Sequence, residues 1–304
     1  MILACGEALI DMLPRQTAAG EDAFAPYAGG AVFNTAIALG RLGAPAGFFC
    51  GISRDFLGQI LRDKLSESGV NSSACVISDR PCTVAFVKLV DGQATYAFYD
   101  ENTAGRMLTE ADLPATDAQA LFFGGISLVA EPCGSAYEAF MLREAPTRVT
   151  MIDPNVRPGF ITDPAAYRAR IDRMLAAADI IKLSDEDLHW LRGTGDTAAL
   201  ARDLVSGGAR LVCITEGAKG VTGYSPENEV FVPATPVKVV DTVGAGDTFN
   251  AGVLASLHAA GALTKPRIAA LTGAEIRDAL TLGTRAAAIT VSRAGANPPR
   301  ASEL

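Results

Sequence analysis

A glycine-rich turn followed by an acid is the part of this sequence with the clearest chemistry. The turn reads Gly244-Ala245-Gly246-Asp247, and it runs from an apolar stretch directly into a predicted helix. Small residues let backbone N–H groups approach a ligand, and the first turn of a helix offers unpaired donors to an anion. An acid at this place can take the proton of a hydroxyl group during phosphoryl transfer. Taken alone, the pattern also allows Asp247 to be a structural N-cap.

The absence of two common nucleotide-binding motifs argues against two classes of protein. The sequence contains no G-x-x-x-x-G-K-[ST], and no G-x-G-x-x-G follows its first predicted strand. The first absence argues against a Walker-type kinase, and the second argues against a dinucleotide-binding dehydrogenase. The sequence therefore predicts that phosphates are held at Thr215–Gly220 and at the 244–247 turn.

With a second glycine signature near its start, the chain resembles the ribokinase (PfkB) family of carbohydrate kinases over essentially its whole length. The resemblance rests on two segments, Ala28-Gly29-Gly30-Ala31-Val32-Phe33-Asn34-Thr35-Ala36 and Asp241-Thr242-Val243-Gly244-Ala245-Gly246-Asp247-Thr248-Phe249. At these positions it implies that Asp247 is the catalytic base. It also implies an anion hole, which is formed by Gly244, Ala245 and Gly246.

The resemblance implies a sugar site at the other end of the chain. Its residues would supply acceptors, donors and close backbone approach to the sugar hydroxyls, and they are Asp11, Gly29, Gly30 and Asn34. Phe98 would pack on the sugar, and Arg157 of Asp153-Pro154-Asn155-Val156-Arg157 would contact the sugar or the phosphoryl group. Simpler interpretations remain open. Asp11 and Asn34 would then be surface residues, Phe98 would pack within its own sheet or at a subunit interface, and Arg157 would brace Asp153.

The implied cofactors are ATP and Mg²⁺, and family members often bind a monovalent cation such as K⁺. The nucleotide-side residues would be Lys182, Ser184, Thr215, Gly217 and Gly220. The family often shows Asn-x-x-Glu after the lysine, whereas this chain has Ser184-Asp185-Glu186-Asp187, so that Asp187 stands at the magnesium position with Glu186 beside it. The acid-rich helix start also fits simple compensation of the helix dipole. The monovalent cation would bind at Asp241, Val243 and Gly295.

The order of the predicted elements indicates an α/β fold. From residue 121 onward, strands alternate with helices, which is typical of a parallel sheet covered by helices on both faces. The segments 1–10 and 46–52 each read as one buried strand. The segment 82–99 reads as an antiparallel hairpin around Asp91-Gly92. The resemblance implies a ribokinase-like three-layer α/β/α core spanning 1–304 as one domain, with a small β lid formed by segments near 8–28 and 82–103.

The composition fits a reduced, cytoplasmic protein. The formal charge is −8 and no run of Lys or Arg occurs, which argues against a nucleic-acid partner. No apolar run is long enough to span a membrane, and the first residues lack the features of a signal peptide. The six cysteines form no C-x-x-C pair, so a disulfide framework or a zinc site is not expected. A homodimer through the lid is one option for the oligomeric state.

The substrate that the resemblance implies is D-fructose, phosphorylated at its primary hydroxyl to fructose 6-phosphate. The segments Gly6-Glu7-Ala8-Leu9-Ile10-Asp11 and Tyr99-Asp100-Glu101-Asn102-Thr103-Ala104 are most similar to those of bacterial fructokinases. A 2-keto-3-deoxygluconate kinase or another sugar kinase of the family is the alternative, with Arg106 and Arg157 as partners for an acidic substrate. A catalytically inactive sugar-sensing regulator is the non-enzyme alternative.

Overall fold

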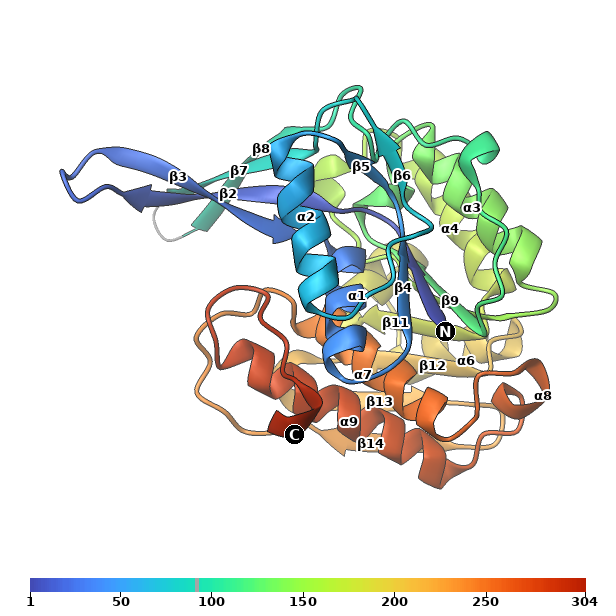
Figure 1. Cartoon of the computed structure of the whole chain (residues 1–304). Helices are drawn as coiled ribbons and strands as arrows, with labels where there is room; N and C mark the ends of the chain where they lie inside the picture. Colours follow the sequence, from blue (N-terminus) through green and yellow to red (C-terminus); the bar gives the residue numbers. More distant parts are fainter. Residues whose placement is uncertain (91–92) are drawn as a thin grey trace.

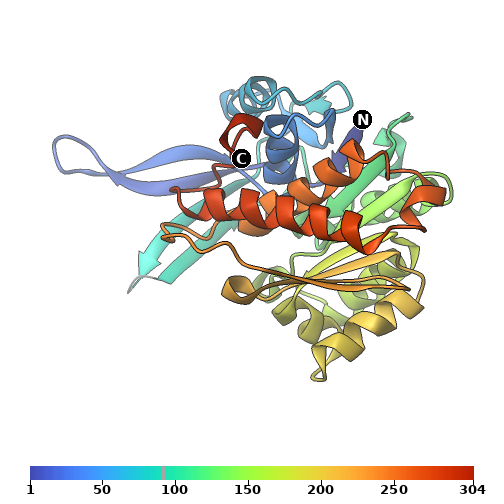
Figure 2. The same ribbon diagram turned by 90° about the horizontal axis from the view of Figure 1, so that it is seen from below.

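The main sheet of the protein lies between two layers of helices (Figures 1 and 2). The computed structural model describes residues 1–90 and 93–304. In them, the main sheet has the strand order β14-β13-β12-β11-β10-β9-β1-β4. Its strands are β1 (Ile2–Cys5), β4 (Ala46–Phe49), β9 (Ala120–Gly124), β10 (Val149–Asp153), β11 (Ile180–Ser184), β12 (Leu211–Thr215), β13 (Gly220–Tyr224) and β14 (Glu229–Pro233). The pairs from β4 to β12 are parallel, whereas β13 pairs antiparallel with both of its neighbours. The predicted mostly parallel α/β sheet is therefore confirmed.

Side chains of each strand enter two separate cores because successive residues point to opposite faces of a sheet. Ile2 lies in one core and Leu3 in the other. The first core is covered by α1 (Ala31–Arg41), α2 (Phe56–Glu67), α7 (Ala245–Ala259), α8 (Lys265–Ile268) and α9 (Gly273–Val291). The second is covered by α3 (Cys133–Glu144), α4 (Pro164–Ala177), α5 (Asp185–Arg192) and α6 (Thr197–Ser206). Among the described residues, no helix combines the length and the apolar character that crossing a membrane requires.

The predictions of single strands at 1–10 and 46–52 were wrong. The first segment breaks after Cys5, and β2 (Leu9–Gln16) enters a different sheet. A Cβ atom at Gly6 would lie 2.4 Å from the Val32 side chain, so this position allows α1 to pack against the break. The second segment breaks at Cys50, and β5 (Gly51–Ser53) pairs with β6 (Val76–Ser78). Local hydrophobicity does not reveal either break, because both halves are buried.

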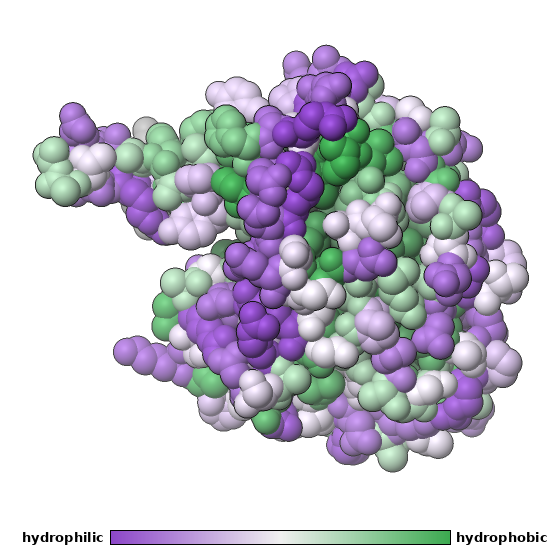
Figure 3. Space-filling view, in the orientation of Figure 1, coloured by the Kyte–Doolittle hydropathy of each residue, from purple (hydrophilic) through white to green (hydrophobic). Residues whose placement is uncertain are grey.

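A second, smaller sheet projects from the body, and an open hollow lies between the two (Figure 3). It has the order β3-β2-β7-β8, and it adds β3 (Asp22–Gly29), β7 (Val84–Val90) and β8 (Gln93–Tyr99) to β2. These strands match the predicted segments near 8–28 and 82–103 to within one residue, and β7 pairs antiparallel with β8 as the sequence predicted. The predicted turn at Asp91-Gly92 lies outside the described residues. That this small sheet acts as a lid stays a prediction.

Close packing of α7 against α9 fixes the helix that begins with the glycine-rich turn. A Cβ atom at Gly252 of α7 would lie 2.5 Å from the Cα atom of Gly283 in α9. A Cβ atom at Gly283 would lie 2.7 Å from the ring of Phe249. Because neither position has room for a methyl group, the two glycines allow the helix backbones to approach each other.

We expect Gly252→Ala to destabilise the protein, because its methyl group would overlap the backbone of α9. Overpacking of this kind costs about 1–3 kcal/mol, against which the better helix propensity of alanine returns at most about 1 kcal/mol. Thermal unfolding should show a lowered melting temperature, by about 2 °C for each kcal/mol of net loss. Gly159→Ala is the control, since no atom lies within 4 Å of a Cβ there. A variant at residue 252 as stable as the wild type would show that α7 and α9 have room to separate.

Candidate active site

Asp247 lies in the first turn of α7 with its carboxylate turned toward α1. Gly244, at φ 79°, is the N-cap of α7, and no side chain caps this helix end. The alternative in which Asp247 is the N-cap is therefore wrong. Its Oδ2 atom accepts a hydrogen bond of 2.9 Å from Asn34 Nδ2, and its backbone carbonyl accepts one of 3.2 Å from Thr35 Oγ1. The N-terminal and C-terminal glycine signatures thus meet at one carboxylate.

The surroundings of Asp247 suit a group that must both take up and release a proton near neutral pH. Burial raises the pKa of the Asp247 carboxyl to about 7, the hydrogen bond from Asn34 works against this rise, and the neighbouring Asp153 adds to it. The Lys182 ammonium lowers the pKa and the Glu7 carboxylate raises it, both more weakly. A buried carboxylate with a pKa near neutrality is the expected property of a general base.

Glu7 is a site residue to which the sequence prediction gave no role. It is buried, and its Oε1 atom accepts hydrogen bonds from the backbone N–H groups of Ala31 (2.8 Å) and Val32 (3.4 Å) at the start of α1. Its Oε2 atom accepts a third, of 3.2 Å, from the backbone N–H of Ser127. Glu7 therefore caps α1 across the break between β1 and β2 and fixes the helix that carries Asn34. An acid directly after Gly6 was the signal available in the sequence.

Lys182 and Asp153 form a buried ion pair beside the glycine-rich turn. Their side chains are 6% and 2% exposed, and Lys182 Nζ lies 2.9 Å from Asp153 Oδ2. The same Nζ atom would lie 3.1 Å from a Cβ atom at Gly246. Lys182 thus lies next to the glycine-rich turn, and its contact with phosphate stays a prediction. The sequence prediction assigned Asp153 no partner among the lysines.

The predicted sugar residues gather at the base of the small sheet. Asp11 of β2 faces β3, and a Cβ atom at Gly29 would lie 2.3 Å from Asp11 Oδ2, so this glycine leaves space for the carboxylate. Burial raises the pKa of the Asp11 carboxyl to about 6. Gly30, at φ 107°, is the N-cap of α1, the helix on which Asn34 lies. The carboxylate of Asp11, the backbone of the glycine pair and the amide of Asn34, which contacts Asp247, form a set that can bind a polyol.

Phe98 and Arg157 belong to segments that meet, since Phe98 lies on β8 and Arg157 is the N-cap of the short turn Pro158–Phe160. The Phe98 ring of β8 packs on the Phe160 ring at a centroid distance of 5.0 Å. Arg157 is exposed, and its guanidinium donates hydrogen bonds to the backbone carbonyls of Asn155 (3.4 Å) and Val156 (3.0 Å). It therefore braces its own loop. Phe98 connects the small sheet to the segment that follows this loop.

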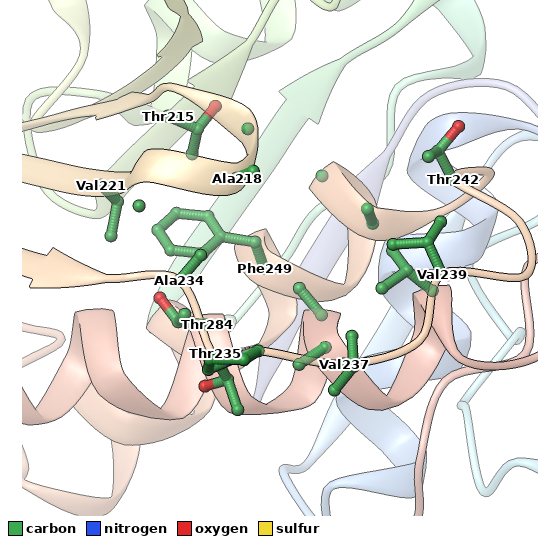
Figure 4. A pocket seen from close by; sticks show the side chains of 18 residues that line it. Thr215, Ala218, Val221, Ala234, Thr235, Val237, Val239, Thr242, Phe249 and Thr284 are labelled. Carbon is green, nitrogen blue, oxygen red and sulfur yellow. The ribbon is translucent and has the colours of Figure 1, made fainter.

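A pocket of about 630 Å³ lies on the other side of the 244–247 turn (Figure 4). Phe249, Val237 and Val239 give it mostly apolar walls, and its lining includes Thr215, Gly217 and Gly220, three of the five predicted nucleotide residues, but neither Lys182 nor Ser184. Ala245 and Gly246, which directly precede Asp247, also line it. The lining residues are Thr215, Gly217, Ala218, Gly220, Val221, Ala234, Thr235, Pro236, Val237, Val239, Thr242, Ala245, Gly246, Phe249, Thr284, Ala287, Ala288 and Val291. An apolar slot that ends at a helix N-terminus suits a flat base with a phosphate tail.

The three acids after Ser184 differ in burial. Ser184 is the N-cap of α5, and its Oγ atom accepts a hydrogen bond of 3.0 Å from the backbone N–H of Asp187. Asp187 is buried, Asp185 is half-buried and Glu186 is exposed. Burial raises the pKa of the Asp187 carboxyl, and nearby Asp153 adds to the rise. Within the described ranges, no group of three or more His, Cys, Asp or Glu side chains is placed to hold a metal.

The three residues predicted for a monovalent cation come together around one carboxylate. Asp241 Oδ1 accepts a hydrogen bond of 3.0 Å from the backbone N–H of Val243, and its Oδ2 atom accepts one of 2.9 Å from that of Gly295. A Cβ atom at Gly244 would lie 2.8 Å from the Cβ atom of Ala296. The segment after α9 therefore packs against the turn that begins α7.

The chain is similar to known sugar kinases over nearly all of its length. A model of the pfkB family carbohydrate kinases matches residues 1–303. A fructokinase of Rhizobium leguminosarum bv. trifolii is 59% identical over 280 residues, which are 91% of this chain and 86% of that protein. The structure of a Xylella fastidiosa fructokinase with bound ATP matches with a TM-score of 0.89 and 30% identity, over 97% of this chain and 93% of that one. A double mutant of a Vibrio cholerae O395 fructokinase, bound to fructose, ADP and potassium, matches with a TM-score of 0.84 and 25% identity, over the same shares of the two chains.

We expect Asp247→Asn to lower kcat for phosphoryl transfer to a sugar by about 10²–10⁴-fold, the usual contribution of a general base. The KM values for both substrates should change little, because the amide keeps the size of the carboxylate. Steady-state assay of ADP release measures both quantities. Asp203→Asn, at an exposed acid of α6, is the control and should match the wild type. A kcat for the Asp247 variant within threefold of the wild type would remove Asp247 from the role of base.

Proposed function

The chain belongs to the pfkB family of carbohydrate kinases, and we propose that it is an ATP-dependent fructokinase that converts D-fructose to fructose 6-phosphate. Enzymes of this kind are phosphotransferases with an alcohol group as acceptor. The observation that carries the proposal is the position of Asp247, which lies between the polar sugar side and the apolar pocket. The high identity to the Rhizobium fructokinase supports fructose as the sugar.

The proposed reaction is a direct transfer in which each residue has one role. Asp247 takes the proton of the primary hydroxyl, and the resulting oxygen attacks the γ-phosphorus of ATP. The new O–P bond forms while the bond between the γ-phosphorus and the β,γ-bridging oxygen breaks, and ADP leaves with the electron pair. The backbone N–H groups at Gly244, Ala245 and Gly246 stabilise the charge on the transferred group. Asp11, Gly29, Gly30 and Asn34 orient the sugar.

The pocket bounded by Phe249 and Val239 supports ATP as the phosphoryl donor. Its apolar walls would hold the base, and Thr215, Gly217 and Gly220 would follow the phosphates toward Lys182. Mg²⁺ is usually held by one or two carboxylates together with substrate phosphates. The buried Asp187 near Lys182 fits that arrangement with Ser184 as its helix cap. When bound, Mg²⁺ would neutralise phosphate charge.

A monovalent cation such as K⁺ would bind beside the anion hole. The Vibrio fructokinase structure was determined with bound potassium. In this chain Asp241, the carbonyl of Val243 and the backbone at Gly295 are the proposed ligands, and the contacts around Asp241 support them. A cation there would brace the turn that begins α7.

The small sheet would close over the sugar and exclude water, which competes with the sugar hydroxyl as acceptor. Phe98 would move with β8 during this closure. Phe24, Tyr27 and Tyr99 of the small sheet are 48%, 44% and 62% exposed. These aromatic side chains support a homodimer through this sheet, since exposed aromatic groups are enriched at interfaces. We place the enzyme in the cytoplasm, where its reduced cysteines and ATP are expected.

The surroundings of two arginines favour a neutral sugar over 2-keto-3-deoxygluconate. Arg106 lies 3.8 Å from a carboxylate oxygen of Asp100, and its Nε atom donates a hydrogen bond of 3.1 Å to the carbonyl of Glu131. Arg157 braces its own loop. Because each guanidinium already has acceptors, a sugar carboxylate would have to compete for them. The buried base and the apolar pocket are both present, which also speaks against an inactive regulator.

A coupled assay of ADP release over a panel of sugars tests the substrate. We expect kcat/KM for D-fructose to exceed that for glucose, ribose and 2-keto-3-deoxygluconate by at least about 10-fold, because the proposed sugar side presents the Asp11 carboxylate and the Asn34 amide, and Arg106 and Arg157 already have acceptors. ¹³C NMR of the product should show phosphate at C6. Strong turnover of 2-keto-3-deoxygluconate without turnover of fructose would contradict the proposed substrate.

A further inference from the structure

A buried acid accepts hydrogen bonds from both a lysine and an amide next to the proposed phosphoryl-transfer centre. Asp153 Oδ2 accepts hydrogen bonds from Lys182 Nζ (2.9 Å) and from Asn250 Nδ2 (2.7 Å). Its Oδ1 atom accepts a third bond, of 3.1 Å, from the backbone N–H of Asn155. The side chains of Asp153, Lys182 and Asn250 are all buried. We call them the Asp153 unit.

The Asp153 unit connects three elements that must keep their relative positions during the reaction. Asp153 ends β10, Lys182 lies on the neighbouring strand β11, and Asn250 lies on α7. Asn250 follows Asp247 by three residues, so both side chains lie on one face of the helix. The base and the amide therefore move together if α7 moves.

The lysine needs such a tether because its ammonium is a point charge on a flexible four-carbon stem. A Cβ atom added at Gly246 would lie 3.1 Å from Lys182 Nζ. The positive charge therefore lies at the proposed anion hole. A displacement of about 1 Å in a site of this kind can cost about 10²-fold in rate. The carboxylate of Asp153 holds the ammonium at this place, and Asn250 holds the carboxylate.

The orientation of Asn250 carries a cost in stability that packing does not explain. Its Oδ1 atom is buried and has no hydrogen-bond partner within the described residues. A buried acceptor without a partner is destabilising, and the reverse orientation would put the amide oxygen against the carboxylate of Asp153. An apolar side chain here would avoid both problems. The amide is therefore expected to have a function in the site.

We propose that Asp153 and Asn250 are positioning residues, which hold the Lys182 ammonium at the anion hole so that it meets the transferred phosphoryl group. The proposal rests on the proposed reaction at Asp247 but on no particular sugar. The charged groups around Asp247 agree with it. Lys182 lowers the pKa of the Asp247 carboxyl, and Asp153 and Glu7 raise it. Because Lys182 is paired with Asp153, the opposite effects of the two charges on the pKa of Asp247 partly cancel before phosphate binds.

The first test compares two deletions of a buried hydrogen bond on α7. Asn250→Leu removes the amide, and we expect kcat to fall about 10- to 100-fold while KM for the sugar stays within twofold. Thr248→Val is the matched control, because Thr248 is buried one residue after the base but its hydroxyl bonds to Thr290 Oγ1 (2.9 Å), away from Asp153. It should change kcat less than threefold. An equal loss of kcat in the two variants would show that Asn250 has only a structural role.

A double-mutant cycle tests whether Asn250 acts through the lysine. Lys182→Met should lower kcat, and adding Asn250→Leu to it should lower kcat by no more than about twofold further, because the group to be positioned is gone. A double variant whose loss in kcat equals the product of the two single losses would overturn the proposal. If Lys182→Met does not fold because Asp153 is left without its cation, Lys182→Arg takes its place. If Asn250→Leu does not fold, Asn250→Ala takes its place. The assay uses the best sugar of the panel, so failure of fructose as substrate leaves this test intact.

Discussion

The hydrogen bond between Asn34 and Asp247 is the contact on which the rest of the site depends. It joins the first turn of α1 to the first turn of α7, and Thr35 adds a second bond to the backbone of Asp247. Glu7 fixes the start of α1, and the glycines at 252 and 283 fix α7 against α9. The main sheet and its helices therefore hold one buried carboxylate between the two predicted binding sides.

Burial makes this carboxylate useful and also costly. An ionised acid in a low-dielectric surrounding is disfavoured, which raises the pKa of Asp247 to about 7. The Lys182 ammonium, which lowers this pKa, is already paired with Asp153. Breaking a buried pair by removing one partner typically costs about 3–5 kcal/mol, so each member of this network constrains the others. The electrostatics of the site thus depend on pairs contributed by distant parts of the chain.

The sequence alone predicted those features of the fold and the site that depend on residues close together in the chain. The Gly-Ala-Gly-Asp turn, the alternation of strands and helices, and the hairpin at 82–99 were predicted from neighbouring residues, whereas the strands near 8–28 came from the family resemblance. The contacts of Glu7, Asp153 and Asn250 were not, because partners lie far apart in the chain. Asn34 and Asp247 are separated by 213 positions, and Asn250 and Asp153 by 97. One sequence carries no signal for such pairs, and Asn34 was found only through the family resemblance.

The pH dependence of kcat/KM for fructose tests most directly whether Asp247 is the base, since this quantity reports groups of the free enzyme. The base works only without its proton, so kcat/KM should rise with pH through a midpoint near 7 and be level above about pH 8. Below about pH 6 the slope should steepen as Asp11 also takes up a proton, and Asp11→Asn should remove only that steeper part. A kcat/KM that stays level from pH 8 down to pH 5 would contradict the account, because a buried Asp247 would then carry a proton without loss of activity.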